Sequence, residues 1–264
     1  MKRQRDGDAA AAAAPSPYAE PMEARAAQTV EFLRSLKLSI PIPTMQAVTD
    51  RRPCSKCGKL RRYYCYDCMT VVHPETHPPL LTLPLSVHVV LHSNEHRSKA
   101  TTLPASIVSP QVSIHEYPNV PELDPATTVV LYPSEHAVSL SALDISTVKQ
   151  VVFIDSTWQQ SKAISKDPRV TGFRHVKIEK KESLFWRFQD KDPSYLATVE
   201  AIYYFVREVV ALRNGGYSGE VDDLLAYYAN QYVTVQKNYT SQSFCRRHFT
   251  DYVLKGVDWN RVFD

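Results

Sequence analysis

The stretch Val151–Ser161, VVFIDSTWQQS, decides the fold prediction. Its apolar residues run from Val151 to Ile154 into Asp155, and a helix-compatible segment follows. A short apolar run bounded by polar residues is typical of a buried strand. An acid and small hydroxyl residues after such a strand lie where open α/β sheets bind their ligands. The same pattern is also compatible with Asp155 or Ser156 acting only as the cap of the next helix.

The composition indicates a globular protein. The chain has 264 residues, 44% of them hydrophobic and 22% charged, with a net charge of +3. That is enough for a sizeable core, and the charge is too small to argue for nucleic acid unless it clusters locally. No apolar run approaches the roughly 20 residues of a membrane span, and the six alanines near the N-terminus are too weak for a secretory signal. We therefore expect an intracellular protein, nuclear or cytoplasmic or both, with no membrane partner and with cysteines that are reduced or metal-bound.

Two Cys-x-x-Cys pairs predict a structural zinc site. Cys54 and Cys57 are separated from Cys65 and Cys68 by seven residues. Each pair forms a tight knuckle whose thiolates can reach one tetrahedral ion, and Gly58 supplies the positive φ that such a knuckle needs. The alternative is a set of buried free cysteines. Because four thiolates leave no open position on zinc, we expect the ion to fasten this segment to the main domain without taking part in catalysis.

Basic and aromatic residues surround the cysteines and suggest contact with RNA. Arg61, Arg62 and Tyr64 represent this cluster, in which cations could neutralise phosphates and rings could stack on unpaired bases. A second basic group could follow a phosphate backbone; it consists of Lys177, Lys180, Lys181 and Arg187. The alternative for both groups is a solvated charged face.

The hydrophobic periodicity predicts an α/β fold. Apolar residues at spacings of three and four predict a helix over 21–38, ended by Pro41 and Pro43. No G-x-G-x-x-G, P-loop, G-x-S-x-G or H-E-x-x-H pattern occurs, so dinucleotide, nucleotide and hydrolase motifs are unsupported. The predicted strands cover 87–92, 127–132, 149–155 and 175–179, and the further predicted helices cover 137–143, 194–212 and 221–235.

Four segments in a fixed order, together with the paired cysteines, resemble the DTW-domain family. The tetrapeptide Asp155-Ser156-Thr157-Trp158 matches the family's D-x-T-W motif, and Tyr132-Pro133-Ser134 matches a second motif at a strand end. Residues 91–95, LHSNE, are similar to the family's His-Pro-x-Glu loop, and residues 198–205, TVEAIYYF, to its Ser-Thr-x-Glu-Ala helix. Ser93 and Ala197 depart from the family's usual proline and serine.

The resemblance implies a tRNA-uridine aminocarboxypropyltransferase. Such enzymes transfer the 3-amino-3-carboxypropyl group of S-adenosylmethionine to N3 of a uridine in the D-loop region of tRNA, and release 5′-methylthioadenosine. The implied fold is an α/β, SPOUT-like knotted sheet with flanking helices, preceded by the zinc module and the N-terminal helix. The expected division is a disordered tail (1–17), an N-terminal helix and linker (18–48), a zinc-binding module (49–80), the catalytic domain (81–240) and a C-terminal segment of unknown role (241–264). The alternatives are a SPOUT-type RNA methyltransferase, and a non-catalytic zinc-binding RNA adaptor; DNA is not an expected partner.

The resemblance also assigns site residues. Asp155 could act as a general base, as a ligand of the donor's ammonium group or as an orienting group, because a carboxylate is a weak base for an imide N–H unless burial raises its pKa. Trp158 could stack on a base or anchor its helix, and Glu200 could instead take part in a capping interaction. The expected catalytic residues are Asp155, Thr157 and Trp158, and the expected residues for binding S-adenosylmethionine are Pro133, Ser134, Asp155, Ser156, Thr198 and Glu200.

Overall fold

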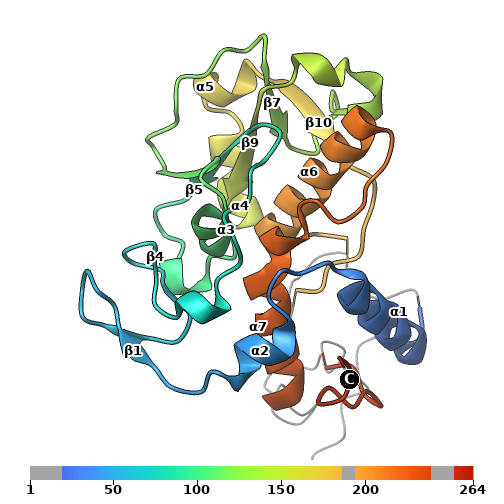
Figure 1. The fold of residues 1–264 in the computed structure, drawn as a ribbon. Helices are drawn as coiled ribbons and strands as arrows, with labels where there is room; N and C mark the ends of the chain where they lie inside the picture. Colours follow the sequence, from blue (N-terminus) through green and yellow to red (C-terminus); the bar gives the residue numbers. More distant parts are fainter. Residues whose placement is uncertain (1–19, 186–193, 239–252, 264) are drawn as a thin grey trace, which may run out of the picture.

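The centre of the molecule is a sheet of six strands that are all paired in parallel (Figure 1). The computed structural model describes residues 20–185, 194–238 and 253–263. The strand order is β6-β5-β9-β7-β10-β8, so β9, which contains the apolar run of the decisive stretch, lies in the middle of the sheet. The strands are β5 (Ser86–Leu91), β6 (Val112–Glu116), β7 (Thr128–Leu131), β8 (Val138–Ser139), β9 (Gln150–Asp155) and β10 (Arg174–Lys177).

Helices cover both faces of the sheet because the strand residues on each face are apolar. Val87, Val129 and Val151 belong to one buried cluster with the helices α3, α6 and α7, together with the short helix that precedes α7. Their neighbours Val130 and Val152 belong to a second cluster with α4 and α5. This burial on both faces is typical of parallel sheets. The helices are α1 (Met22–Ser35), α2 (Ile42–Ala47), α3 (Leu103–Val108), α4 (Trp158–Ile164), α5 (Pro168–Thr171), α6 (Thr198–Asn214) and α7 (Ala226–Asn238).

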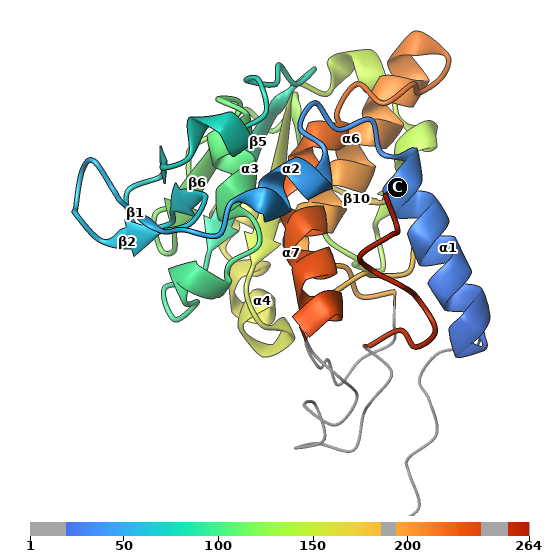
Figure 2. The same ribbon diagram turned by 60° about the horizontal axis from the view of Figure 1, so that its bottom comes forward.

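The N-terminal helix α1 lies beside α7 and the last described segment of the chain (Figure 2). Ala26 and Leu33 of α1 share a buried cluster with Tyr232 of α7 and with Trp259. The segment between α1 and α2 is held by two adjacent carboxylates: the Lys37 N–H donates to Asp222 Oδ2 at 2.7 Å, and the Ser39 N–H donates to Asp223 Oδ1 at 2.9 Å. Helix α1 is therefore part of the packed core and not an appendage.

The cysteine-rich segment folds into two small antiparallel hairpins. The first pairs β1 (Arg52–Pro53) with β2 (Leu60–Arg61), and the second pairs β3 (Tyr64–Cys65) with β4 (Thr70–Val71). Gly58 has a φ of 72°, as predicted for the first knuckle. Met69 occupies the matching position after the second pair and has a φ of 52°, which a residue with a Cβ adopts only at a cost of roughly 1–2 kcal/mol.

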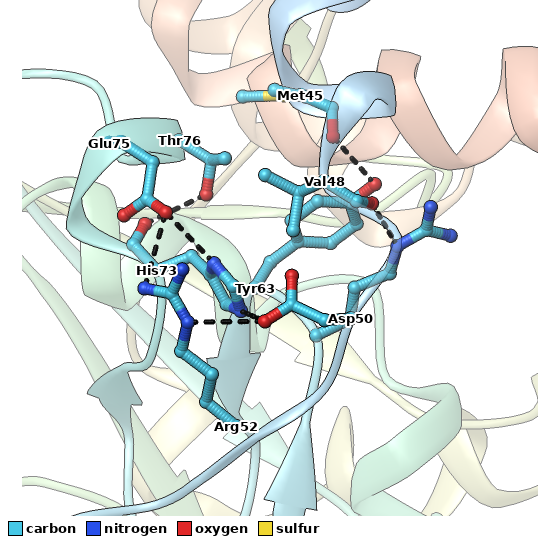
Figure 3. Close-up of polar contacts among 9 residues, drawn as sticks. Met45, Val48, Asp50, Arg52, Tyr63, His73, Glu75 and Thr76 are labelled. Carbon is cyan, nitrogen blue, oxygen red and sulfur yellow. Dashed lines mark hydrogen bonds and ion pairs between the residues drawn. The ribbon is translucent and has the colours of Figure 1, made fainter.

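A buried histidine connects this segment to its surroundings (Figure 3). His73 is fully buried, and its Nδ1 lies 3.0 Å from Glu75 Oε1 while its Nε2 lies 3.8 Å from Asp50 Oδ2. Arg52 bridges the same two carboxylates at 3.2 and 3.3 Å. The Tyr63 hydroxyl donates to the carbonyl of Met45 in α2 at 3.1 Å, so the hairpins are fixed against the helical layer.

Most element predictions are confirmed, but two parts of them are wrong. The four predicted strands correspond to β5, β7, β9 and β10. The helix predicted over 137–143 is instead the short strand β8, followed by a 3-10 turn at Leu140–Ala142, because Val138 pairs with Val176 of β10. The helix predicted over 221–235 begins as a 3-10 turn at Asp222–Leu225, and α7 starts only at Ala226. Further short 3-10 turns are Pro74–Thr76, Arg97–Lys99 and Ile145–Thr147.

Sequence periodicity also missed elements. Strand β6 and helices α2, α3 and α5 were not predicted; α2 begins after Pro41, where the sequence placed only a helix end. The predicted tail over 1–17 lies outside the described residues, as does most of the C-terminal segment. Among the described helices, none is long and apolar enough to cross a lipid bilayer.

Candidate active site at the carboxyl edge of the sheet

The predicted site residues lie where the central parallel strands end. In the register of the sheet, Leu91 of β5 is opposite Asp155 of β9, and Leu131 of β7 is opposite Val176 of β10. The loops that follow these four strands therefore leave the sheet at the same edge. This is the position at which open parallel sheets bind ligands.

Asp155 is held by two threonine hydroxyls from distant parts of the chain. Thr102 Oγ1 donates to Asp155 Oδ2 at 2.6 Å, and Thr198 Oγ1 donates to Asp155 Oδ1 at 2.9 Å. Burial raises the pKa of the Asp155 carboxyl above its usual value, while the two hydroxyls act in the opposite direction and the charge of Glu95 adds to the rise. A carboxylate has about four acceptor positions, so two of them stay available to a ligand. Asp155 does not cap the next helix; Thr157 does.

A cavity of about 380 Å³ lies next to Asp155, and we call it the large cavity. Ile154 and Ser156, the chain neighbours of Asp155, line it, and so does its partner Thr198. Three lysines also line it, at positions 177, 180 and 181. The volume is within the range of about 300–1,000 Å³ of small-molecule sites. Glu179 lines it as well and pairs with Lys181 at 3.1 Å. The cavity therefore combines apolar walls with a charged side of three lysines and one acid, and Asp155 lies between two residues of its lining.

The structure brings several predicted donor-binding residues to this cavity. Pro133 lines it together with Ser156 and Thr198. Ser134 is the next residue, and its hydroxyl lies 2.8 Å from Nδ1 of His175, whose pKa is lowered by burial and by His136.

Thr157, at the start of α4, makes a local contact. Thr157 is its N-cap, and the Thr157 N–H donates to Gln160 Oε1 at 3.1 Å. Trp158 is the first residue of the helix. The catalytic roles expected of Thr157 and Trp158 stay predictions.

Glu200 lies close in sequence to Thr198 but makes different contacts. Its side chain is 2% exposed. It accepts hydrogen bonds from the Leu184 N–H at 2.7 Å, the Ala197 N–H at 2.8 Å and the Ser183 hydroxyl at 2.6 Å. Burial raises the pKa of the Glu200 carboxyl against the effect of these donors. The structure thus places Glu200 in the capping interaction that the sequence left open, where it ties residues 183–184 to the start of α6.

The four predicted metal ligands come together. The sulfur atoms of Cys54, Cys57, Cys65 and Cys68 all lie within 4.8 Å of one another, and among the described residues this is the group that could hold a metal ion. Sulfurs at about 2.3 Å from a tetrahedral zinc ion would be roughly 3.8 Å apart, and Cys57 Sγ and Cys65 Sγ are 3.7 Å apart. The donor set and its spacing therefore fit zinc, and His73 is not part of the group.

The basic residues predicted to contact RNA near the cysteines have partners inside the protein. Arg61 donates to Asp67 Oδ2 at 2.9 Å and lies 4.2 Å from the ring centre of Tyr66. Arg62 Nε donates to the Val48 carbonyl at 2.7 Å. Tyr64 packs against the ring of Tyr227 with the ring centres 4.9 Å apart. Lys180 and Lys181 line the large cavity, whereas Arg187 lies outside the described residues.

One residue of the site was missed by sequence reasoning. Thr102 is fully buried and lies 53 residues before its partner Asp155. Nothing in the pattern of residues 94–102 singles out Thr102. Lys177, which belongs to the predicted second basic group, ends β10 and lines the large cavity.

The fold and the site define a class of protein, a parallel α/β protein with a cavity at the carboxyl edge of its sheet. Comparisons with known proteins name the family. A model of the DTW domain matches residues 62–236, and the chain belongs to this family. A relative from Xenopus laevis, named tRNA-uridine aminocarboxypropyltransferase 1, is 30% identical over 251 residues, which cover 76% of this chain and 86% of that protein. Proteins of the same name from Mus musculus (30% over 233 residues; 70% and 77%) and Homo sapiens (28% over 237 residues; 71% and 78%) are similar. No solved structure matches the chain significantly. The predicted family resemblance is thus confirmed.

Proposed function

We propose that this protein transfers the 3-amino-3-carboxypropyl group of S-adenosylmethionine to N3 of a uridine in the D-loop region of tRNA. The observation that carries the proposal is the cavity beside Asp155, in a chain whose relatives are named as enzymes of this activity. Asp155 lies between two residues of the cavity lining, and the lining contains three lysines, of which Lys181 is paired with Glu179. A carboxylate and a lysine are the two charges that complement the amino and carboxylate groups of the transferred moiety.

Asp155 would bind the ammonium group of the donor. Its carboxylate is already fixed by Thr102 and Thr198, so little further ordering is needed when a ligand arrives. Lys177 would pair with the donor's carboxylate, since it ends β10 in the lining of the same cavity. With both charged ends held, the Cγ carbon has a fixed orientation, and such positioning can reduce a barrier by about 7–11 kcal/mol in well-oriented cases.

The reaction balances without a redox partner. The N3–Cγ bond forms as the Cγ–S bond breaks, the electron pair of that bond neutralises the sulfonium, and the N3 proton leaves to solvent. The product sulfur compound is 5′-methylthioadenosine. Because the sulfonium carries a methyl group as well, the walls around it must keep that methyl away from the uridine.

We extend the proposal to the remaining parts of the chain. The sheet would belong to the SPOUT-like knotted class. Zinc would be the ion of the four cysteines. Lys180, Lys181 and Arg187 would contact phosphates, with Arg61, Arg62 and Tyr64 nearer the zinc module. The five-part division of the chain and a nuclear or cytoplasmic location complete this proposal.

The test is incubation with unmodified tRNA and S-adenosylmethionine labelled in its carboxyl group. We expect the label to enter the tRNA and 5′-methylthioadenosine to accumulate in equal amount. If the tRNA gained a methyl group while the label stayed in solution, the protein would be a methyltransferase. If the tRNA bound but its mass never changed, the adaptor alternative would replace the enzyme.

A further inference from the structure

A second cavity, of about 190 Å³, lies between the cysteine-rich hairpins and α7. Four tyrosines line it, and we call it the tyrosine cavity; they are Tyr63, Tyr64, Tyr227 and Tyr228. The remaining wall comes mainly from residues 98–101, in the segment that connects β5 to α3. The tyrosine cavity thus lies where three separate parts of the chain meet. Its volume is below the range of about 300–1,000 Å³ of drug-sized ligands, so it suits a single planar ring system.

The walls of the tyrosine cavity are fixed in place. The hydroxyl of Tyr63 donates to Met45 in α2, and the hydroxyl of Tyr227 lies 3.0 Å from His77 Nδ1. The rings of Tyr63 and Tyr227 are 6.3 Å apart and inclined by 42°. Tyr63 and Tyr64 are only half-buried, so part of each ring stays accessible. A preformed aromatic wall of this kind binds a flat ring with little further ordering.

The polar lining favours a nucleobase over a hydrophobic group. Among the described residues of the lining, none is acidic, while Lys99 and Gln231 are both exposed. An amide can hydrogen-bond with the edge of a base, and a lysine can approach the adjoining phosphate. Proteins recognise unpaired RNA bases by this combination of stacking and edge contacts.

The tyrosine cavity is a neighbour of the proposed reaction centre. Thr101 lines it, and the next residue, Thr102, donates to Asp155. The Thr101 hydroxyl also accepts a hydrogen bond from the Val199 N–H at 3.5 Å, directly after Thr198, which lines the large cavity. The first turn of α6 and the Thr101-Thr102 dipeptide therefore link the walls of both cavities. The same two parts of the chain lie between a ring in the tyrosine cavity and a ligand in the large cavity.

We infer that the tyrosine cavity receives an unpaired base of the tRNA next to the modified uridine, a conclusion that rests on the proposed function. The base stacks on the tyrosine wall while its neighbour, the target uridine, faces the donor. In this arrangement the hairpins hold the RNA strand in register with Asp155. The zinc module thereby selects the position of the uridine and takes no part in the bond-forming step.

The experiment combines a filled cavity with a missing base. Ala100→Phe places a ring in the tyrosine cavity, and Ala142→Phe makes the same change at an exposed position outside both cavities. Each protein is titrated at constant salt with intact tRNA and with tRNAs that are abasic at the residue before or after the target uridine. Binding of S-adenosylmethionine and urea unfolding are measured alongside. Gln231→Ala, at an exposed position of the lining, serves as a second variant in case Ala100→Phe does not fold.

We expect Ala100→Phe to weaken binding of intact tRNA about tenfold, in line with the loss of one stacked base. One of the two abasic tRNAs should bind the wild-type protein about tenfold more weakly than intact tRNA does. The same abasic tRNA should bind Ala100→Phe as tightly as intact tRNA binds that variant. Gln231→Ala should weaken binding of intact tRNA about threefold, and Ala142→Phe should bind it as tightly as the wild type does. The inference is overturned if an abasic tRNA loses as much affinity for Ala100→Phe as it loses for the wild type. It is also overturned if the folded variants bind intact tRNA normally, or if they lose affinity for S-adenosylmethionine instead. Failure of the wild type to transfer label would refute the proposed function separately.

Discussion

Asp155 and Glu200 are two carboxylates near the start of α6, and they differ in what holds them. Burial raises the pKa of both. Glu200 accepts two backbone N–H groups and the Ser183 hydroxyl from residues within 17 positions of it, and a hydrogen bond with Tyr228 also lowers its pKa. Asp155 accepts only two hydroxyls, which lie 53 and 43 residues away. Backbone donors satisfy Glu200 in a closed network, whereas Asp155 keeps acceptor capacity beside a cavity. The difference separates a carboxylate that maintains the structure from one that is available to a ligand.

The largest expected effect is on stability, and it follows from removing the hydrogen bonds that Glu200 accepts. Glu200→Ala leaves two buried N–H groups and a hydroxyl without their acceptor, each worth about 1–3 kcal/mol. We expect the free energy of unfolding in urea to fall by about 3 kcal/mol or more. The control Glu31→Ala, at an exposed position of α1, should change it by less than about 0.5 kcal/mol. A small effect at Glu200 would remove the distinction between the two carboxylates.

The next effect should appear in activity and not in stability. Asp155→Asn keeps the shape of the side chain and can still accept from one threonine, but it loses the charge that would hold the donor's ammonium group. We expect label transfer to fall about 100-fold, in line with the roughly 2–5 kcal/mol lost when one partner of a buried charge pair is removed, with urea unfolding close to the wild type. Asp124→Asn, in an exposed loop, is the matched control. Near-normal transfer by folded Asp155→Asn would show that Asp155 is no more than a structural acceptor.

The two threonines should have smaller and unequal effects. Thr198→Val removes a hydroxyl that lines the large cavity, so we expect both a higher KM for S-adenosylmethionine and a loss in kcat. Thr102 is fully buried, so Thr102→Val should lower kcat about tenfold and leave that KM nearly unchanged, as expected for a positioning residue. Steady-state kinetics with varied donor separates the two. Equal changes in KM would mean that Thr102 also contacts the donor.

The smallest expected effect is a shift of the pH profile. The pKa of Asp155 is raised from its usual 3.8, so the carboxylate becomes protonated, and activity is lost, as pH falls through that raised value. Each hydroxyl donor lowers this pKa because it stabilises the charged form. Thr102→Val should therefore move the acid limb of kcat/KM to higher pH, while the wild-type limb already lies above 3.8. An acid limb that stays in place would assign it to another group.

Sequence patterns predicted the parts of the site that are local. The apolar run before Asp155, the two cysteine pairs and the positive φ of Gly58 all depend on neighbours within a few residues, and the structure confirms them. The strand at 138–139 was mistaken for part of a helix because its pairing with β10 is set by residues about 40 positions away. Thr102 was missed for the same reason, since only the fold brings it to Asp155.

The basic and aromatic cluster shows what residue types alone do not predict. Arg61, Arg62 and Tyr64 were predicted to contact RNA from their types alone, and each also makes a defined contact inside the protein. Their contact with RNA stays a prediction. Residue type alone does not show whether a cationic side chain is available to a phosphate or already donates to a carbonyl of the protein. The tyrosine cavity, which uses two rings of the same cluster together with two from α7, became visible only in three dimensions.

The two carboxylates that hold the segment between α1 and α2 bear on how small this protein can be made. The family match covers residues 62–236, but Asp222 and Asp223 are buried and accept from Lys37 and Ser39, which precede it. Trp259, which follows it, packs with α1 and α7. A version trimmed to the matched segment would expose apolar surface and remove the backbone donors of Asp222 and Asp223. The smallest autonomous folding unit is therefore longer than the stretch by which the family is recognised, and protease should release a fragment that retains α1.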